Sequence, residues 1–273
     1  MPQPYPGFLT FIFKRIGDMH WKFTQWMHNI RIGLQCCACL LLFFIHGAAP
    51  VQAQHLSGYG VPLLRSPAAY RNTVLQDPDK EMLELKTLTP GLRYELRYAR
   101  DQNFVHTAVY PAGTTITFLR RPAALALHQV DSVLAQEGLG LKIFDAYRPY
   151  RVTVRFWELV QDERYVAHPS RASGHNRGLA VDLTLVDRSS GAELEMGTGF
   201  DHFSDTAHHS FPDLPQAVLR NRKKLLTVMT QFGFQPYTYE WWHYSWPNNR
   251  GYEALDLEFN QLLRMQPKRV VRQ

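Results

Sequence analysis

The chain has 273 residues, a formal net charge of +6 at pH 7, and apolar residues at 45% of its positions. Four basic residues and one acidic residue lie in residues 1–53, so residues 54–273 carry only +3. This small excess does not indicate a nucleic-acid partner. All three cysteines lie near the N-terminus, at positions 36, 37 and 39, which excludes a disulfide, a thiolate nucleophile and a cysteine zinc site from residues 54–273.

The N-terminal part has the features of a secretory signal. Lys22 and Arg31 precede an uncharged apolar run at residues 34–45, and small residues follow as far as Ala53. We expect cleavage after Ala53. The run of about 12 residues is shorter than the roughly 20 that a transmembrane helix needs, so no stable membrane anchor is expected after cleavage. Translation from Met27 rather than from the first methionine would give the signal an ordinary length.

Two parts of the chain are therefore predicted. Residues 1–53 form an N-terminal extension with the signal, and residues 54–273 form one domain, exported to the periplasm or the cell exterior. A segment of that length can bury a single core.

The first half of this domain is predicted to hold one strand and one helix. Glycines and prolines interrupt residues 54–80, which are expected to be loop-like. Residues 92–98 alternate apolar and charged side chains, a pattern typical of a half-buried strand. Pro122 then begins a helix with its apolar residues on one face, and Gly138 ends it.

The second half mixes strands and helices without a regular β–α–β order. Residues 141–147 and 179–185 are apolar runs of strand length. Between them, four apolar residues at helical spacing predict a helix: Val152, Phe156, Leu159 and Val160. A last helix is expected over residues 215–232, and a strand or strand pair over residues 237–246. We predict an α+β fold with a central, mainly antiparallel sheet flanked by helices.

Two polar residues lie at or near the predicted strand over residues 179–185. His175 precedes it, and Asp182 lies within it among leucine, alanine and valine. Gly178 allows a turn that folds His175 back beside Asp182. A buried carboxylate needs a partner, and a metal ion can be that partner. The alternative is a solvated histidine and an aspartate paired with an arginine. For a His-x₆-Asp motif found in isolation, this alternative would be favoured.

A Glu-x-x-His pair, Glu240 and His243, lies in the last predicted strand. On an ideal strand the two side chains would face opposite sides, so we place Glu240 on the incoming loop and His243 on the strand. The aromatic residues around them are expected to wall the site and exclude water: Trp241, Trp242, Tyr244 and Trp246. The alternative is an aromatic core with a hydrogen-bonded histidine.

Together these stretches supply what a hydrolytic zinc site needs. Two histidines and Asp182 can hold the ion with a fourth position open, and Glu240 can accept a proton from water. Other divalent ions can occupy nitrogen and oxygen sites of this kind. Arg148 ends the strand at residues 141–147, and its guanidinium could stabilise an oxyanion or pair with Asp145. Position alone favours the ion pair.

The chain resembles the zinc-dependent D-alanyl-D-alanine dipeptidases, the VanX-like family within a wider group of peptidoglycan D,D-carboxypeptidases and dipeptidases. Six segments carry the resemblance in the family's order: residues 98–104, 144–149, 173–185, 196–201, 208–209 and 240–244. The metal-ligand pattern is common to the wider group. The motifs Asp-Leu-Thr-Leu, Met-Gly-x-x-Phe-Asp and Glu-Trp-Trp-His-Tyr look specific to the dipeptidases.

The resemblance implies a role for each matching residue. One Zn²⁺ per chain would be bound by His175, Asp182 and His243. Glu240 would be the general base, and Arg148 would stabilise the oxyanion. The two ends of a free dipeptide would be held by Tyr98, by Asp201 toward the ammonium and by Ser173 toward the carboxylate. Gly174 and Asn176 replace serines that are frequent in the family, which bears on fine specificity.

The implied activity is zinc-dependent hydrolysis of D-Ala-D-Ala to two D-alanines. One alternative is a D,D-carboxypeptidase or endopeptidase that trims wall peptides in an open groove, and Asp201 favours the dipeptidase. Another is a non-catalytic zinc module that binds wall fragments, which would need neither Glu240 nor Arg148. Because of the signal, the expected substrate is dipeptide released outside the inner membrane, for nutrient recovery or wall remodelling.

Overall fold

The computed structural model describes residues 55–266. The predicted secretory signal and its cleavage site lie outside this range, so they stay predictions. Within the described range, no helix combines the length and the apolar character that a bilayer span requires.

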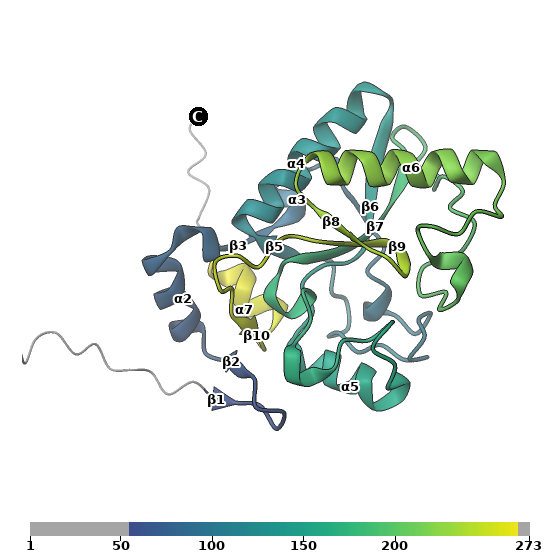
Figure 1. The fold of residues 1–273 in the computed structure, drawn as a ribbon. Helices are drawn as coiled ribbons and strands as arrows, with labels where there is room; N and C mark the ends of the chain where they lie inside the picture. Colours follow the sequence, from purple (N-terminus) through teal and green to yellow (C-terminus); the bar gives the residue numbers. More distant parts are fainter. Residues whose placement is uncertain (1–54, 267–273) are drawn as a thin grey trace, which may run out of the picture. The chain divides into compact units, whose positions relative to one another are not determined.

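A five-stranded sheet forms the centre of the fold (Figure 1). Its strands, in spatial order, are β4 (Arg93–Tyr94), β6 (Leu139–Asp145), β7 (Ala180–Asp187), β9 (Glu240–Ser245) and β8 (Gln235–Tyr237). The β4–β6 pair is parallel and the other three pairs are antiparallel. The predicted α+β fold with a mainly antiparallel sheet is thus confirmed.

Helices cover both sides of this sheet. Figure 1 shows α4 (Arg121–Gln136) and α6 (Gln216–Gln231) on one side and α5 (Tyr150–Val160) on the other. Apolar side chains of α4 and α6 pack with β6 and β7 in one buried cluster, and Phe156 of α5 belongs to a second. Burial of these apolar faces supplies the main driving force for docking the helices.

Smaller elements complete the described domain. A three-stranded sheet is formed by β1 (His55–Leu56), β2 (Pro62–Leu64) and β10 (Ala254–Leu255), and a two-stranded one by β3 (Met82–Glu84) and β5 (Phe118–Arg120). Three further helices are α2 (Pro67–Gln76), α3 (Leu85–Leu88) and α7 (Phe259–Arg264). Single 3₁₀ turns are η1 (Pro78–Lys80), η2 (Arg97–Ala99), η3 (Pro169–Arg171), η4 (His175–Arg177) and η5 (Asp205–Ala207).

The expectation of a loop over residues 54–80 is wrong, because α2 forms there. The Ser66 side chain accepts a hydrogen bond from the Ala68 N–H, and Pro67 stands in the first turn. Proline is well tolerated at that position, since its missing N–H would have no partner within the helix. Ser-Pro is therefore a helix start here, not an interruption.

The strand expected over residues 92–98 is shorter than predicted. Beyond β4, the Glu95 N–H still donates to the Ile143 carbonyl at 2.9 Å, and the chain then turns into η2. That turn buries Tyr98, which is 2% exposed. Apolar and charged residues do alternate over residues 92–98, but the hydrogen-bonded pairing with β6 ends where the chain turns into η2.

Two further details differ from the expectations at helices. Leu159 is 59% exposed on α5 instead of facing the core. Helix α6 matches the range predicted for the last helix, but the short helix α7 follows it.

Candidate active site

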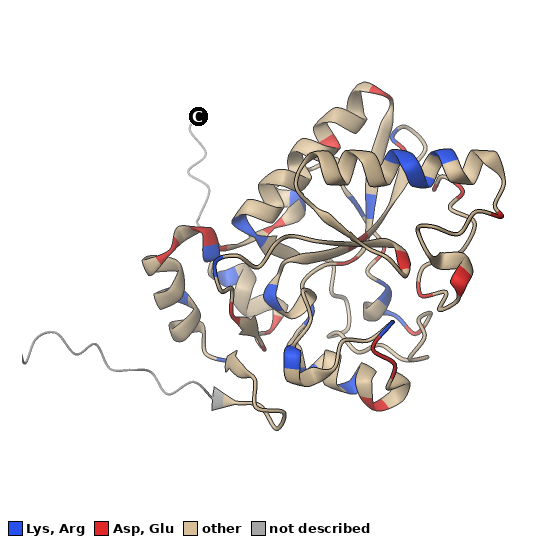
Figure 2. Ribbon diagram, in the orientation of Figure 1, with Lys and Arg blue, Asp and Glu red and all other residues tan. Residues whose placement is uncertain are grey.

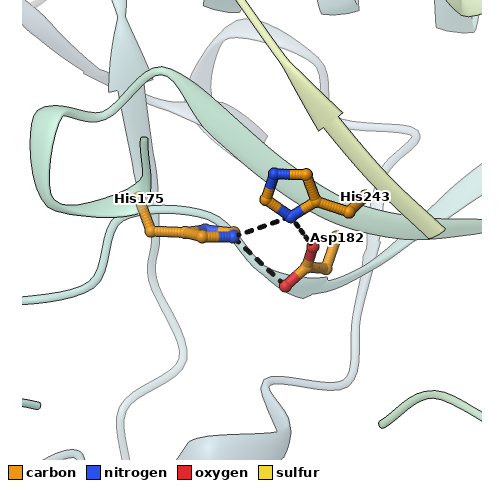
Figure 3. A group of neighbouring side chains, drawn as sticks. All are labelled: His175, Asp182 and His243. Carbon is orange, nitrogen blue, oxygen red and sulfur yellow. Dashed lines mark hydrogen bonds and ion pairs between the residues drawn. The ribbon is translucent and has the colours of Figure 1, made fainter. Parts of the chain in front are cut away.

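Three potential metal ligands meet at the centre of the sheet (Figure 3). The antiparallel register of β7 and β9 sets Asp182 opposite His243, and η4 brings in His175. His175 Nε2 lies 3.3 Å from Asp182 Oδ2 and 3.3 Å from His243 Nδ1. His243 Nδ1 in turn lies 2.9 Å from Asp182 Oδ1. One ligand atom from each residue lies within 4.8 Å of the others.

The second nitrogen of each histidine is also engaged. His175 donates from Nδ1 to the Ala146 carbonyl at 2.7 Å, which leaves Nε2 free to act as a ligand. His243 Nε2 lies 3.1 Å from the Ser245 hydroxyl oxygen, which can accept a hydrogen bond from its N–H. Outer partners of this kind fix the orientation of metal-binding imidazoles.

The protonation states of the group also suit a cation. Burial lowers the pKa of His243, which favours the neutral imidazole that metals bind. Burial alone would raise the pKa of Asp182, but His175 and His243 outweigh it and lower that pKa, so the carboxylate stays charged. Two imidazole nitrogens and one carboxylate oxygen are a donor set typical of a catalytic zinc site.

A sharp turn places His175. Gly178 ends η4 with φ of +68°, and a Cβ there would lie 2.4 Å from Met82 Sδ, so glycine is required. The buried Arg120 guanidinium donates from Nε to the Arg177 carbonyl at 2.9 Å. The turn is thus held from outside the cavity while His175 faces inward.

Asn176, one of the departures from the family pattern, is a structural link. Its amide donates to the Arg148 carbonyl at 2.9 Å and to the Thr153 hydroxyl at 2.8 Å. Its carbonyl oxygen accepts from the Ser173 N–H at 2.8 Å. Asn176 therefore joins the η4 turn to α5 from the buried side.

Glu240 is the first residue of β9, so its expected placement on a loop is wrong. It nevertheless shares a side with His243, with Glu240 Oε2 3.8 Å from His243 Nδ1. Pairing of β9 with β7 covers only residues 243–245, and the β8–β9 register shifts between Pro236 and Tyr237. The ideal alternation therefore does not apply at Glu240. Burial, with Asp182 and Asp201 nearby, raises its pKa well above the usual value.

Arg148 forms the ion pair that its position favours. Its Nε and Nη2 atoms lie 2.9 and 2.8 Å from Asp145 Oδ2, and the Tyr110 hydroxyl donates to Asp145 Oδ1 at 2.6 Å. The guanidinium also lies 3.8 Å from Asp182 Oδ2 and lines the cavity, so the pair does not remove it from the site. No sequence pattern predicted Tyr110 as a site residue, because only the fold brings its hydroxyl to Asp145.

Asp201 and Tyr98 form a second polar group in the cavity. The Tyr98 hydroxyl donates to Asp201 Oδ1 at 3.0 Å, whereas Asp201 Oδ2 is buried without a hydrogen-bond partner among the described residues. Burial raises the pKa of Asp201 well above its usual value. Its φ of +62° is unusual for a residue other than glycine, and such strain is often found at functional sites. Ser173 lines the same cavity.

All eight predicted site residues line one cavity of about 320 Å³. This volume lies at the lower end of the range for ligand pockets, which suits a small substrate. The eight residues are Tyr98, Arg148, Ser173, His175, Asp182, Asp201, Glu240 and His243.

The expected aromatic wall is only partly correct. Trp242 lines the cavity, but Trp241 donates to the Thr198 hydroxyl, and Tyr244 and Trp246 pack in the core. The rest of the wall is formed by the nearby Tyr237 and by rings distant in sequence, which local spacing could not indicate: Phe104, Phe156, Tyr165 and Phe203. Over the described part of the ribbon, basic and acidic residues are interspersed (Figure 2).

The chain is similar in sequence to known D-alanyl-D-alanine dipeptidases. A family model described as D-ala-D-ala dipeptidase matches residues 78–262. The D-alanyl-D-alanine dipeptidase of Escherichia coli (strain K12) is 37% identical over 180 residues, which cover 66% of this chain and 92% of that protein. The D-alanyl-D-alanine dipeptidase of Enterococcus faecalis is 31% identical, over 59% of this chain and 89% of that protein. The solved LdcB LD-carboxypeptidase aligns over 52% of this chain and 65% of its own, at 22% identity and a TM-score of 0.33.

Proposed function

The chain belongs to the D-ala-D-ala dipeptidase family, and we propose that it hydrolyses the free dipeptide D-Ala-D-Ala to two D-alanines. The proposal is supported most directly by Asp201. A buried carboxylate oxygen without a partner is costly unless a donor completes it. The ammonium group of a free dipeptide is such a donor, and an internal residue of a longer peptide has no such group.

His175, Asp182 and His243 are the residues that would hold a divalent metal ion, and we propose Zn²⁺. A bound zinc ion would supply a Lewis acid that polarises the scissile carbonyl and lowers the pKa of water. The ligand positions are maintained by the Ala146 carbonyl and the Ser245 hydroxyl.

Glu240 acts as the proton carrier. Its carboxylate lies beside His243 in the same cavity, within reach of a water molecule directed at the substrate carbonyl. It accepts the proton of the attacking water and then passes that proton to the leaving amine.

Arg148 stabilises the negative charge that develops on the carbonyl oxygen. Because Asp145 holds the guanidinium in place before the substrate arrives, little reorganisation is needed during the reaction. Tyr98 fixes Asp201 at the ammonium end, and we assign Ser173 to the carboxylate end.

The first test is release of free D-alanine by the purified protein, with and without a chelator. We expect chelator-sensitive cleavage of D-Ala-D-Ala and little cleavage of N-acetyl-D-Ala-D-Ala or of a wall pentapeptide. Efficient cleavage of the pentapeptide would assign the protein to the carboxypeptidase alternative. Cleavage of none of the three would favour the wall-fragment binding module.

A second test addresses the proton carrier. The Glu240→Gln variant should lose at least about a hundredfold in kcat and still bind metal, because glutamine keeps the shape but cannot carry the proton. Glu158→Gln, on the exposed side of α5, is the matched control and should behave as the wild type. Full activity of Glu240→Gln would rule out the proposed base.

We also propose that the enzyme is exported and acts on dipeptide outside the inner membrane. This part rests on the basic and apolar pattern of residues 1–53. Fractionation of the native cells is the test, and finding the protein in the cytosol alone would contradict it.

A further inference from the structure

One end of the cavity is buried and the other reaches the surface. The end that holds the proposed metal ligands is enclosed, since His175 is 2% exposed and Asp182 is 3% exposed. The opposite lining includes half-buried rings and exposed charged residues, such as Glu163 and Arg171. The rings at this outer end decide how much of a substrate can extend beyond the site.

Three of these rings come from separate segments. Phe104 follows η2, Tyr165 lies between α5 and η3, and Phe203 lies between β7 and η5. We refer to Phe104, Tyr165 and Phe203 as the aromatic roof. All three are half-buried, whereas rings that serve only as core, such as Phe118 and Phe234, are 0% and 2% exposed.

The rings of the aromatic roof contact each other in a continuous row. Tyr165 and Phe203 stack with centroids 4.7 Å apart and an interplanar angle of 24°. Phe203 meets Phe104 edge to face at 5.3 Å, and Phe104 meets Phe156 of α5 at 4.8 Å. Stacked and edge-to-face pairs are stabilising beyond the area that they bury, so the row holds the segments together.

A hydrogen bond joins the segment of Tyr165 to the β8–β9 hairpin. The Tyr237 hydroxyl donates to the Glu163 carbonyl at 3.4 Å, and the Tyr237 ring lies 5.5 Å from that of His243. The segment at residues 161–167 is thus tied to Phe203 on one side and to the hairpin on the other.

We propose that the aromatic roof determines specificity by limiting the length of the peptide that the site accepts. This inference rests on the proposed function and deepens it. A free dipeptide ends at its ammonium group, whereas a longer peptide with the same two C-terminal residues continues as amide-linked chain. The stacked rings narrow the outer end through which that chain would have to pass and present mainly apolar faces to its amide groups, so its entry is unfavourable.

The test is a ratio of kcat/KM values for two substrates, L-Lys-D-Ala-D-Ala and D-Ala-D-Ala, measured with the full protein. In Phe203→Ala and Tyr165→Ala we expect the tripeptide-to-dipeptide ratio to rise by about tenfold, because each change breaks the stack that narrows the outer end. Tyr165→Phe keeps the ring and should return the wild-type ratio. A gain of tripeptide cleavage cannot result from partial unfolding.

Tyr59→Ala is the matched control. Its ring lies 5.9 Å from that of His168, which directly follows the segment at residues 161–167, but does not line the cavity, so the ratio should stay at the wild-type value. An unchanged ratio in both roof variants, with dipeptide cleavage retained, would overturn this inference alone. A wild-type protein that fails to cleave the dipeptide would instead contradict the proposed function.

Discussion

In the proposed mechanism, Asp145 positions the Arg148 guanidinium without itself contacting the metal or the substrate. Its Oδ2 atom accepts a hydrogen bond from Arg148 Nε and forms an ion pair with Arg148 Nη2, and its Oδ1 atom accepts a hydrogen bond from the Tyr110 hydroxyl. An amide at this position offers one acceptor fewer, so Asp145→Asn leaves either Arg148 or Tyr110 without its partner. We expect kcat to fall by about a hundredfold, comparable to loss of an oxyanion donor, while metal content is unchanged.

The control for this prediction is Asp131→Asn. Asp131 is also a buried aspartate paired with an arginine, at 3.0 Å from Arg188, but it lies on α4 and does not line the cavity. The Asp131→Asn variant should be less stable than the wild type, but the kcat of its folded form should be unchanged. Equal kcat values for Asp145→Asn and the wild type would show that Arg148 does not need this support.

His209 predicts a pH dependence of stability. Burial, with Arg222 and His243 nearby, lowers its pKa from 6.5 to about 4. The folded state therefore disfavours the charged ring, so the free energy of unfolding should be highest above pH 6.5 and fall as the pH decreases toward 4. The loss attributable to this group is at most about 3 kcal/mol.

The measurement is urea unfolding of the wild type and His209→Gln between pH 7 and pH 4. Because glutamine does not titrate, the difference in unfolding free energy between the two proteins should shrink as the pH falls. A difference that stays constant over this range would contradict the prediction.

At the scale of elements, α6 holds the loop that carries Asp201. Arg222 of α6 is 4% exposed and donates to the carbonyls of Met196, Thr206 and His208 at 2.7, 2.9 and 3.1 Å. These carbonyls flank Asp201 on both sides. One buried guanidinium therefore fixes a loop that has little regular structure of its own.

Arg222→Leu should loosen this loop and move Asp201. We expect kcat/KM for D-Ala-D-Ala to fall by about ten- to a hundredfold, mainly through KM, because small displacements of a binding group are costly. Arg220→Leu, an exposed position on the same helix, should have little effect. If both variants had the same KM as the wild type, the role assigned to Arg222 would be incorrect.

At the scale of the whole molecule, metal removal should lower thermal stability. An ion that binds only the folded chain at about a hundred times its Kd stabilises the fold by about 2.7 kcal/mol. For a domain of this size, that corresponds to a decrease of roughly 5–10 °C in Tm after chelation. Scanning calorimetry with and without chelator is the measurement.

Two variants separate this effect from loss of activity. His243→Ala removes a ligand and should abolish the chelator-dependent shift, whereas Glu240→Gln should retain the full shift. A wild-type protein whose Tm does not respond to chelator would not fit a metal site built from His175, Asp182 and His243.

The sequence predicted the strongly patterned parts of the fold and site. The buried strand with Asp182, the helices at α4 and α6 and the sheet class follow from apolar periodicity, which packing then reinforces. The Glu-x-x-His and His-x₆-Asp stretches, taken together and with the family resemblance, predicted residues that line one cavity.

What the sequence could not predict depends on long-range contacts. The position of Glu240 depends on a register shift between two strands, and α2 depends on a cap at Ser66. Tyr110 and Tyr165 carry no local signal, since only the packing of distant segments brings them to Asp145 and Phe203.

The placement of His243 on β9 has a consequence for how the protein is made. His175 and Asp182 emerge from the ribosome close together, but His243 follows Asp182 by 61 positions. A nascent chain therefore holds two ligands long before the third, and the loop between them must close before all three can meet. At the proposed metal site, capture of the ion would therefore follow the pairing of β7 with β9.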